Sequence, residues 1–93
     1  MRWTWDPGKA KKNFVKHKVS FELAKLVLDD PFRISVRDSF PDEERWRTVG
    51  SPSTDGIVVL FVVHTWPEGE NEEGRIISAR RATRNERSAY EER

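Results

Sequence analysis

Arginine residues flank a short apolar stretch near the carboxyl end of the sequence, in RIISARRATR. Arg75 precedes the apolar residues, and Arg80, Arg81 and Arg84 follow them. A guanidinium group presents a planar fork of donors that can hold a phosphate through two hydrogen bonds, so these residues could bind nucleic-acid backbone. The alternative is that they pair with the acidic segment 66–74, or meet solvent at the ends of a strand.

Other side chains could take part in proton transfer. Lys16 and His17 stand in KHK, at the end of a basic helix, and a histidine can move protons at neutral pH. The alternative for His17 is structural, with the ring bonded to the last carbonyl groups of the helix. His64 ends a buried apolar stretch and is more simply interpreted as a core histidine. Glu44 and Arg45 are neighbours in DEERWR, where the carboxylate could act as a base or orient the arginine.

The residue types present exclude several kinds of site. The chain has no cysteine, so it has no disulfide and no thiolate metal site. Its two histidines are far apart, and neither a metal nor a cofactor is expected. The longest apolar run, residues 57–63, is far shorter than the roughly 20 residues of a membrane helix. With no secretion signal in sight, we expect a cytoplasmic protein without membrane contact.

The net charge of +1 hides a strong separation of charge along the chain. Residues 1–28 hold seven Lys or Arg and two acids, residues 29–74 four and eleven, and residues 75–93 six and three. If the two ends of the chain meet, they form a basic surface that could attract a polyanion. The alternative is a set of ordinary solvated faces.

The apolar periodicity predicts one α+β domain over residues 1–93, with helices packed on an antiparallel sheet. A short strand, two helices, a meander of three to four strands and a closing helix are expected in that order. The stretch GIVVLFVVHT is apolar on both faces and should be the central strand. The expected strands cover residues 2–5, 32–38, 44–50, 56–65 and 75–80, and the expected helices cover 7–18, 21–30 and 84–93.

Side-chain caps should mark where the helices begin. Asp6 with Pro7 is expected to start the first helix, and Ser20 the second. Thr83 and Glu86 have the spacing of a capping box at the start of the third.

Periodicity also predicts which side chains share a face. The first helix should turn Ala10, Phe14 and Val15 inward, and its outer side should present Lys9, Lys12, Asn13 and Lys16. In the last strand, alternation separates Arg75 from Arg80. One face would carry Ile76, Ser78 and Arg80, and the other Arg75, Ile77, Ala79 and Arg81. A twist, or a site at the strand end, would then be needed for both arginines to reach one phosphate.

Three segments together resemble the family of BrnT-type toxins. They are WDPGKAKKNFVKHKVSFELAKLVLDDP, EERWRTVG and RIISARRATRNERSAYEE, in this order and over nearly the whole chain. The W-D-x-x-K-x-x-x-N opening, the KH-x-VSF joint and the R-I-I-S-A-R strand are specific in combination. Lys18 departs from the family, which commonly has glycine at this left-handed helix end. The acidic segment 66–74 replaces a stretch where an arginine is common, which argues against a part for it in an RNA site.

The resemblance implies a ribonuclease toxin with a RelE-like fold, from a type II toxin–antitoxin pair. It implies an RNA substrate and an antitoxin of the ribbon-helix-helix DNA-binding kind, which blocks the toxin and brings the complex to operator DNA. Carried over by position, the family pattern includes Lys9, Asn13, Lys16, His17, Ser20, Glu44, Arg45, Arg75, Ser78, Arg80, Glu86 and Tyr90. Ser20 and Glu86 are helix caps within that set.

On this basis we expect RNA cleavage without a metal ion, by attack of a ribose 2′-OH on the adjacent phosphate, with inhibition of translation and growth. Arg45, Arg75 and Arg80 would stabilise the transition-state charge, and Lys16 and His17 would supply the base or the proton donor. The expected RNA-binding residues are Lys9, Lys12, Asn13, Arg81 and Arg84. The alternative is a module that binds nucleic acid or antitoxin without catalysis.

Overall fold

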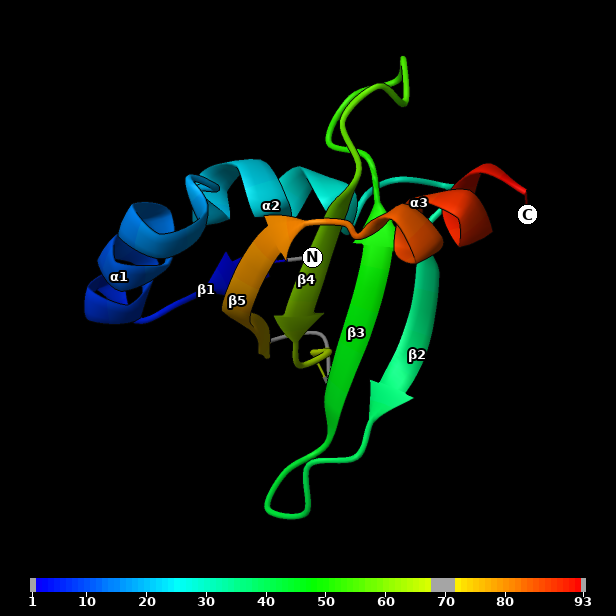
Figure 1. Cartoon of the computed structure of the whole chain (residues 1–93). Helices are drawn as coiled ribbons and strands as arrows, with labels where there is room; N and C mark the ends of the chain where they lie inside the picture. The colour runs from blue at the N-terminus through cyan, green and yellow to red at the C-terminus, as the bar shows by residue number, and fades with distance from the viewer. Residues whose placement is uncertain (1, 68–71, 93) are drawn as a thin grey trace.

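Five strands of the described residues form one mixed sheet in the order β1-β5-β4-β3-β2, with three helices around it (Figure 1). The structure, a computed structural model, describes residues 2–67 and 72–92, so residues 68–71 of the acidic segment lie outside the described residues. No helix in these ranges is long and apolar enough to cross a membrane. The elements are β1 (Arg2–Thr4), α1 (Pro7–His17), α2 (Phe21–Val27), β2 (Ile34–Asp38), β3 (Arg45–Gly50), β4 (Leu60–His64), β5 (Glu73–Arg81) and α3 (Arg84–Glu91).

The sequence predicted an antiparallel sheet, but the sheet is mixed. β2 to β5 form the expected antiparallel meander, with β4 in the centre. β1, however, pairs with the outer edge of β5 in the parallel direction, with Thr4 opposite Arg75. A parallel pair needs a long connection, which the intervening helices and strands supply. Gly74 permits this pairing, because a Cβ at its position would clash with the indole of Trp3.

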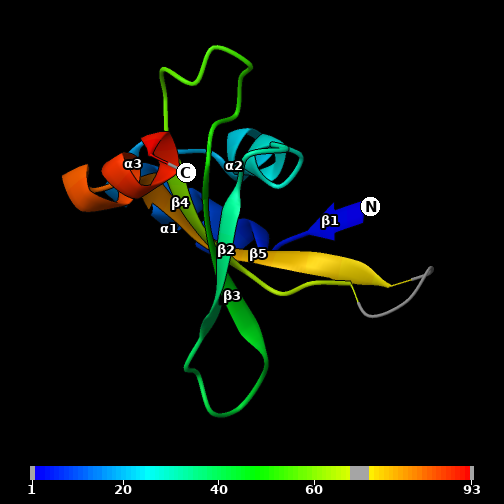
Figure 2. The ribbon, with the colours of Figure 1, turned by 90° about the vertical axis from the view of Figure 1, so that its right-hand side faces the viewer.

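The core lies between α2 and one face of the sheet. Phe21, Ala24 and Val27 of α2 have no exposed surface and belong to one cluster with Leu60 and Val62 of β4. Burial of one large apolar side chain contributes roughly 1.5–3 kcal/mol, so this cluster fixes α2 on the sheet. α3 lies on the opposite side of the sheet from α2 (Figure 2). The second face is therefore covered only in part.

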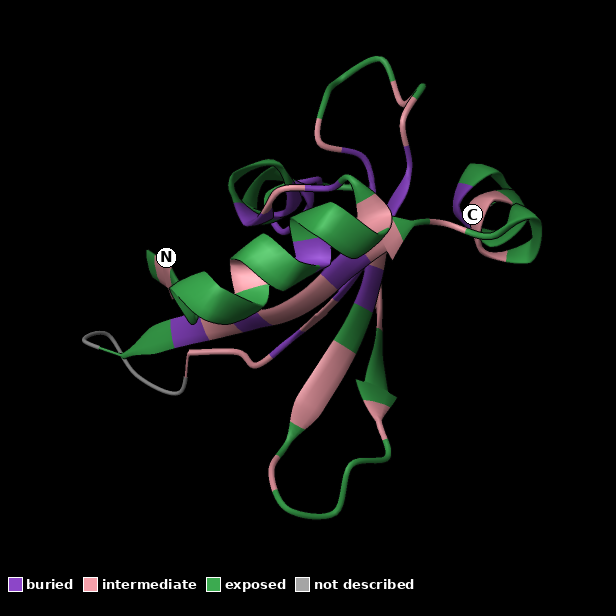
Figure 3. Ribbon diagram, turned by 60° about the vertical axis from the view of Figure 1, so that its left-hand side comes forward, coloured by how far each residue is buried: buried purple, intermediate pink, exposed green. Residues whose placement is uncertain are grey.

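α1 lies against the edge of β5, and its buried contact is polar (Figure 3). Asn13 donates from Nδ2 to the carbonyl oxygens of Ala79 (2.8 Å) and Val19 (3.0 Å), and its Oδ1 accepts from the Ala79 N–H at 3.1 Å. The side-chain amide thus takes the place of a neighbouring strand at this edge. Phe14 and Val15 are instead 50% and 65% exposed. The predicted directions of Phe14, Val15 and Asn13 are wrong, because the helix meets a strand edge rather than an apolar face.

Local signals in the sequence correctly predicted where the helices begin, but the predicted end of the second helix at residue 30 is wrong, because α2 ends at Val27. The Asp6 carboxylate accepts from the first backbone N–H groups of α1, and the Ser20 hydroxyl accepts from α2. Thr83 and Glu86 form the complete capping box. Lys18 has a φ of 60°, so the left-handed helix end expected at this position is present.

An irregularity in the pairing of β4 with β5 changes which residues of β5 share a face. Val63 lies opposite Ser78, but the next residue, His64, lies opposite Ile76. Ile77 is therefore an extra residue on β5, as in a β-bulge, and the alternation of side chains is interrupted there.

The bulge brings two predicted site residues to the same face. Ile76 and Ala79 are three positions apart, yet both are buried in the core. Arg75 precedes Ile76, and Arg80 follows Ala79, so both arginines point away from the core. The prediction that alternation separates them is wrong, because a strict period of two does not allow for the extra residue.

Candidate functional site

The face of the sheet that points away from the core carries the predicted catalytic arginines, and we refer to it as the arginine face. Alternation from the buried residues places there Arg45 and Arg47 of β3 and Phe61 of β4, beside Arg75 and Arg80 of β5. Two strands, β3 and β5, thus bring positive charge to one side of the molecule. The sequence suggested such a surface but not its members.

Glu43 joins Arg45 and Arg75 at the amino end of β5. Its Oε1 accepts from Arg45 Nε at 2.8 Å and from Arg75 Nη2 at 2.5 Å. The hydrogen bond from Arg45, followed by that from Arg75, holds the pKa of the Glu43 carboxyl below its usual value. Two guanidinium groups share one carboxylate, which leaves a net positive charge and most of their N–H donors for a ligand. These three residues are the amino-end cluster.

A cavity of about 300 Å³ opens beside the amino-end cluster. It lies where the amino ends of β3 and β5 meet the carboxyl end of β4. Its walls combine two indole rings, one guanidinium group and several carboxylates. The lining residues are Glu43, Glu44, Trp46, Thr65, Trp66, Glu72, Glu73 and Arg75.

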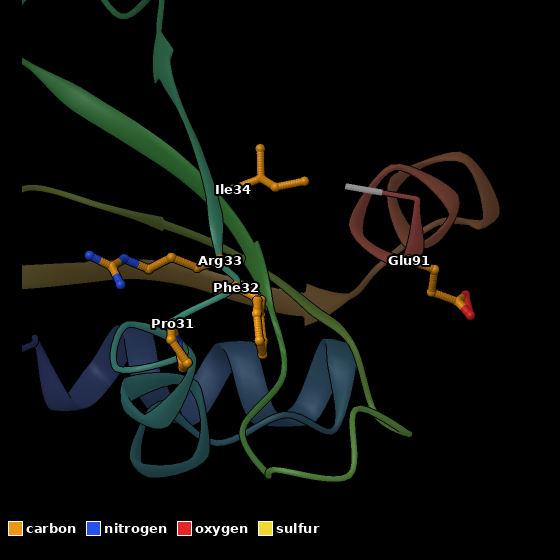
Figure 4. Close-up of a pocket in the computed structure, with 5 residues that line it drawn as sticks. All are labelled: Pro31, Phe32, Arg33, Ile34 and Glu91. Carbon is orange, nitrogen blue, oxygen red and sulfur yellow. The ribbon is translucent and has the colours of Figure 1, made fainter.

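A larger hollow, of about 510 Å³, lies between the start of β2 and α3. It is lined by Pro31, Phe32, Arg33, Ile34 and Glu91. The side chains of these residues point in different directions, and Arg33 and Glu91 point away from each other (Figure 4). Polar groups do not converge there, so the hollow is not a good candidate for a reaction site.

His64 is a core histidine, as the sequence indicated. The ring has no exposed surface. Burial lowers the pKa of His64 to about 4, so the ring is neutral at pH 7. Because the Thr65 carbonyl oxygen can only accept, Nδ1 donates to it (3.1 Å), and Nε2 accepts from the Thr48 hydroxyl at 2.6 Å. Within residues 2–67 and 72–92, no group of three or more His, Asp or Glu side chains could hold a metal ion.

Glu86 holds Arg80 at the carboxyl end of β5. Nη1 and Nη2 of the arginine donate to the two carboxylate oxygens at 2.8 and 3.0 Å, and Nη1 also donates to the Arg81 carbonyl oxygen at 3.0 Å. The guanidinium carbon lies 4.0 Å from the centroid of the Phe61 ring. The hydrogen bond from Arg80 is the largest cause that lowers the pKa of Glu86. Most donors of Arg80 are therefore already in use.

Other predicted residues gather near this end of β5. Asn13 binds Ala79, and α1 ends at His17 about 6 Å further along the helix axis, at 1.5 Å per residue. His17 is half-buried, whereas Lys16 is exposed. The carboxyl-end group consists of Lys16 and His17 of α1, Arg80 and Arg81 of β5, and Arg84 at the start of α3.

The predicted catalytic residues are therefore divided between the two ends of β5. Glu43 brings Arg45 and Arg75 together, whereas Arg80 is bound by Glu86 at the other end. Of the predicted RNA-binding residues, Lys9 and Lys12 are exposed along α1, and Asn13 is 8% exposed with its amide bound to backbone.

Sequence reasoning missed Glu43, which is the residue that joins the two arginines. DEERWR contains adjacent glutamates, and Glu44 was singled out instead. In the structure Glu44 pairs with Arg37 at 3.9 Å. Arg75 pairs with Glu43, which lies in the β2–β3 loop and not in the acidic segment 66–74. Which of the two neighbouring glutamates, Glu43 or Glu44, reaches Arg75 depends on how the β2–β3 loop packs against β5.

Comparisons with known proteins give a family and a fold. The model of a family described as "Ribonuclease toxin, BrnT, of type II toxin-antitoxin system" matches residues 5–86. The fold is similar to the crystal structure of the Brucella abortus ribonuclease toxin BrnT, with a TM-score of 0.61 and 23% sequence identity. That similarity covers 90% of this chain and 99% of the other. A comparison with curated proteins gives no match.

Proposed function

The chain belongs to the BrnT family of ribonuclease toxins of type II toxin–antitoxin systems, and on this premise we propose that it cleaves RNA without a metal ion at the amino-end cluster. The observation that supports this site is the Glu43 carboxylate, which holds the guanidinium groups of Arg45 and Arg75 side by side at a cavity. Cleavage of RNA by its own 2′-OH needs a base near that hydroxyl and positive charge on the phosphate oxygens. This cluster offers both.

In the proposed reaction, phosphate oxygens take over N–H donors of Arg45 and Arg75. Because these donors then stabilise the carboxylate less, the pKa of Glu43 rises toward its usual value and the group becomes a better base. Glu43 takes the proton of the 2′-OH as the 2′ oxygen bonds to phosphorus. The bond from phosphorus to the 5′ oxygen breaks, and that oxygen takes a proton from water. The products are a 2′,3′-cyclic phosphate and a 5′-OH.

The other members of the carboxyl-end group, Lys16, His17, Arg81 and Arg84, are proposed to bind the RNA strand away from the cut, together with Lys9 and Lys12. At about 3.3 Å per residue, the Cα atoms of Arg75 and Arg80 are roughly 16 Å apart, too far for both ends of β5 to act on one phosphate. This separation favours strand binding by Lys16 and His17 over the base or donor part considered from the sequence. Exposed cations in this position would make the affinity for RNA depend on salt.

The family membership implies an RNA substrate and an antitoxin partner. We further propose that the antitoxin is a ribbon-helix-helix protein that brings the complex to operator DNA, and that the toxin, a single RelE-like domain over residues 1–93, inhibits translation and growth in the cytoplasm. The sequence resemblance supports these finer points. If the toxin alone shifts operator DNA in a gel, the proposed dependence on the antitoxin is wrong.

The function is tested by incubating the purified protein with an RNA oligonucleotide in excess EDTA. We expect cleavage, with 2′,3′-cyclic phosphate and 5′-OH ends, and no cleavage where a 2′-deoxynucleotide precedes the cut. Glu43→Gln should lower the rate by about 10²-fold or more, because it removes the base and retains an oxygen that can accept from the arginines. Asp42→Asn, a change in the same loop outside the cluster, should leave the rate unaltered.

Three results would count against this proposal or a part of it. RNA that is retarded in a gel but remains intact would support the non-catalytic binding module. Cleavage that stops with EDTA and returns with a divalent ion would contradict metal independence. Full activity of Glu43→Gln would leave cleavage standing and remove Glu43 as the base.

A further inference from the structure

We infer that the cavity beside the amino-end cluster is a subsite for a guanine base next to the cut, with Trp46 as its stacking surface and Glu44 as its hydrogen-bond acceptor. The inference rests on the proposed function, because the base is placed beside the phosphate that Arg45 and Arg75 hold. The cavity volume of about 300 Å³ lies within the range of small-ligand sites.

The two indole rings of the cavity differ in what they already contact. Trp66 is fixed in place, since its ring centroid lies 4.7 Å from that of His64 and Arg33 lies 5.7 Å from it. Trp46 is half-buried, and in the described part of the chain no aromatic ring or cation packs on it. Because Trp46 lines the cavity, its indole can meet a planar ligand bound there, and bases stack readily on such rings.

The charges of the lining favour a base over a phosphate inside the cavity. Glu44, Glu72 and Glu73 contribute carboxylates, whereas Arg75, together with Arg45, supplies positive charge on the side of Glu43. The three carboxylates would repel the RNA backbone and attract a neutral ring whose edge donates hydrogen bonds. The phosphate is thereby confined to the arginines, and the adjacent base enters the cavity.

Among the four bases, guanine best matches a carboxylate acceptor. Its N1–H and amino group are adjacent donors, which suit the two oxygens of one carboxylate. In adenine and cytosine the amino group stands beside a ring nitrogen that would face the carboxylate with a lone pair. Glu44 is suited to the task because its ion pair with Arg37 is long, at 3.9 Å, and both side chains are at least half exposed. Such a pair is weak and is easily exchanged for a ligand.

The test compares RNA substrates that are identical except for one purine beside the cut, which is guanosine, inosine or adenosine. Inosine lacks the amino group and retains N1–H, so the rate should fall from guanosine to inosine to adenosine. We expect a guanosine-to-adenosine ratio of kcat/KM of roughly ten- to a hundredfold. Glu44→Gln should reduce this ratio by about tenfold or more, and Trp46→Ala should lower cleavage of the guanosine substrate by roughly ten- to a hundredfold.

Trp46→Phe should restore stacking, and Phe32→Ala, a change to an exposed aromatic side chain outside the cavity, should have no effect on the ratio. Normal cleavage with an equal preference in wild type, Glu44→Gln and Trp46→Ala would overturn the subsite and leave the proposed function intact. If no RNA is cut at all, the proposed function fails. The subsite is then decided by calorimetry with GMP and AMP: GMP binding that Trp46→Ala abolishes supports it, and equal or absent binding refutes it.

Discussion

The two ends of β5 carry the same residue type in different electrostatic settings. At the amino end, Arg75 shares one carboxylate with Arg45, and Arg75 and that carboxylate line a cavity. At the carboxyl end, Arg80 donates to both oxygens of Glu86, one of which also accepts from the Thr83 N–H, and it donates to a backbone carbonyl as well. The first arrangement leaves donors and net positive charge for a ligand, whereas the second neutralises the arginine and fastens α3 to the sheet.

This difference shows that an arginine on an exposed face is not by that alone a phosphate-binding residue. Whether an arginine can bind phosphate depends on how many guanidinium groups share its carboxylate partner, and on whether that carboxylate has a second structural role. Glu86 also caps α3, so releasing Arg80 would disturb the helix start. Glu43 has no such second task in the described structure, and its arginines can change partners when a phosphate arrives.

The largest contrast is expected between Arg75→Ala and Arg80→Ala in RNA cleavage. Loss of Arg75 removes a charge-stabilising donor and should lower kcat by about 10²–10³-fold with an unchanged melting temperature. Loss of Arg80 should lower the melting temperature, because α3 loses its ion pair, and should reduce the rate by less than about tenfold. The comparison between the two ends fails if both variants lose the same activity.

A large effect on stability is expected for Asn13→Ala. The change leaves the Ala79 N–H and the carbonyl oxygens of Ala79 and Val19 without their side-chain partner, at a cost of about 2–4 kcal/mol in the free energy of unfolding. The measurement is urea denaturation, with Lys12→Ala on the exposed side of α1 as the control that should change little. A neutral Asn13→Ala would mean that α1 does not depend on this edge contact.

His64 is buried as a neutral ring, which predicts that the free energy of unfolding depends on pH. The pKa of His64 is lowered to about 4 in the folded protein, so between about pH 4 and 6.5 the unfolded state binds more protons. The free energy of unfolding should therefore fall by about 2 kcal/mol between pH 7 and pH 5 on account of His64. His64→Gln should lack this component, and His17→Gln, which leaves the buried ring in place, should retain it. If the free energy of unfolding varies with pH in the same way in wild type and in His64→Gln, the buried neutral ring is contradicted.

The smallest effect is expected at Glu86, which caps α3 and pairs with Arg80 at the carboxyl end of β5. Glu86→Ala removes both the cap and the ion pair with Arg80, and should cost about 1–2 kcal/mol, whereas Glu86→Gln preserves the cap and should cost about half as much. Because the pKa of Glu86 is lowered, the contribution of the ion pair is present above about pH 4.5 and is lost as the pH falls through the folded value. Glu86→Gln also frees donors of Arg80, so its affinity for RNA should rise. If Glu86→Ala melts like wild type, α3 is not held by this residue.

Features that depend on neighbouring residues were predictable from the sequence. The caps at Asp6, Ser20 and Thr83 and the left-handed Lys18 each involve groups a few positions apart, so the residue types suffice. The strand meander and the central position of β4 follow from hydrophobic alternation and from its interruption by polar turns. β4 itself is shorter than expected, and Ile57 in the preceding segment is 67% exposed.

The candidate site was predicted only in part, because its geometry depends on contacts between distant segments. The sequence by itself determined which cations are available, and the family motifs indicated that several of them act on RNA. The tertiary structure decided that β1 pairs with β5 in the parallel direction, that Asn13 completes a strand edge and that Glu43 rather than Glu44 joins the arginines. It also decided, through the extra residue at Ile77, that Arg75 and Arg80 share a face. Each of these outcomes is fixed by a hydrogen bond or pairing register between residues far apart in the chain, which local periodicity does not specify.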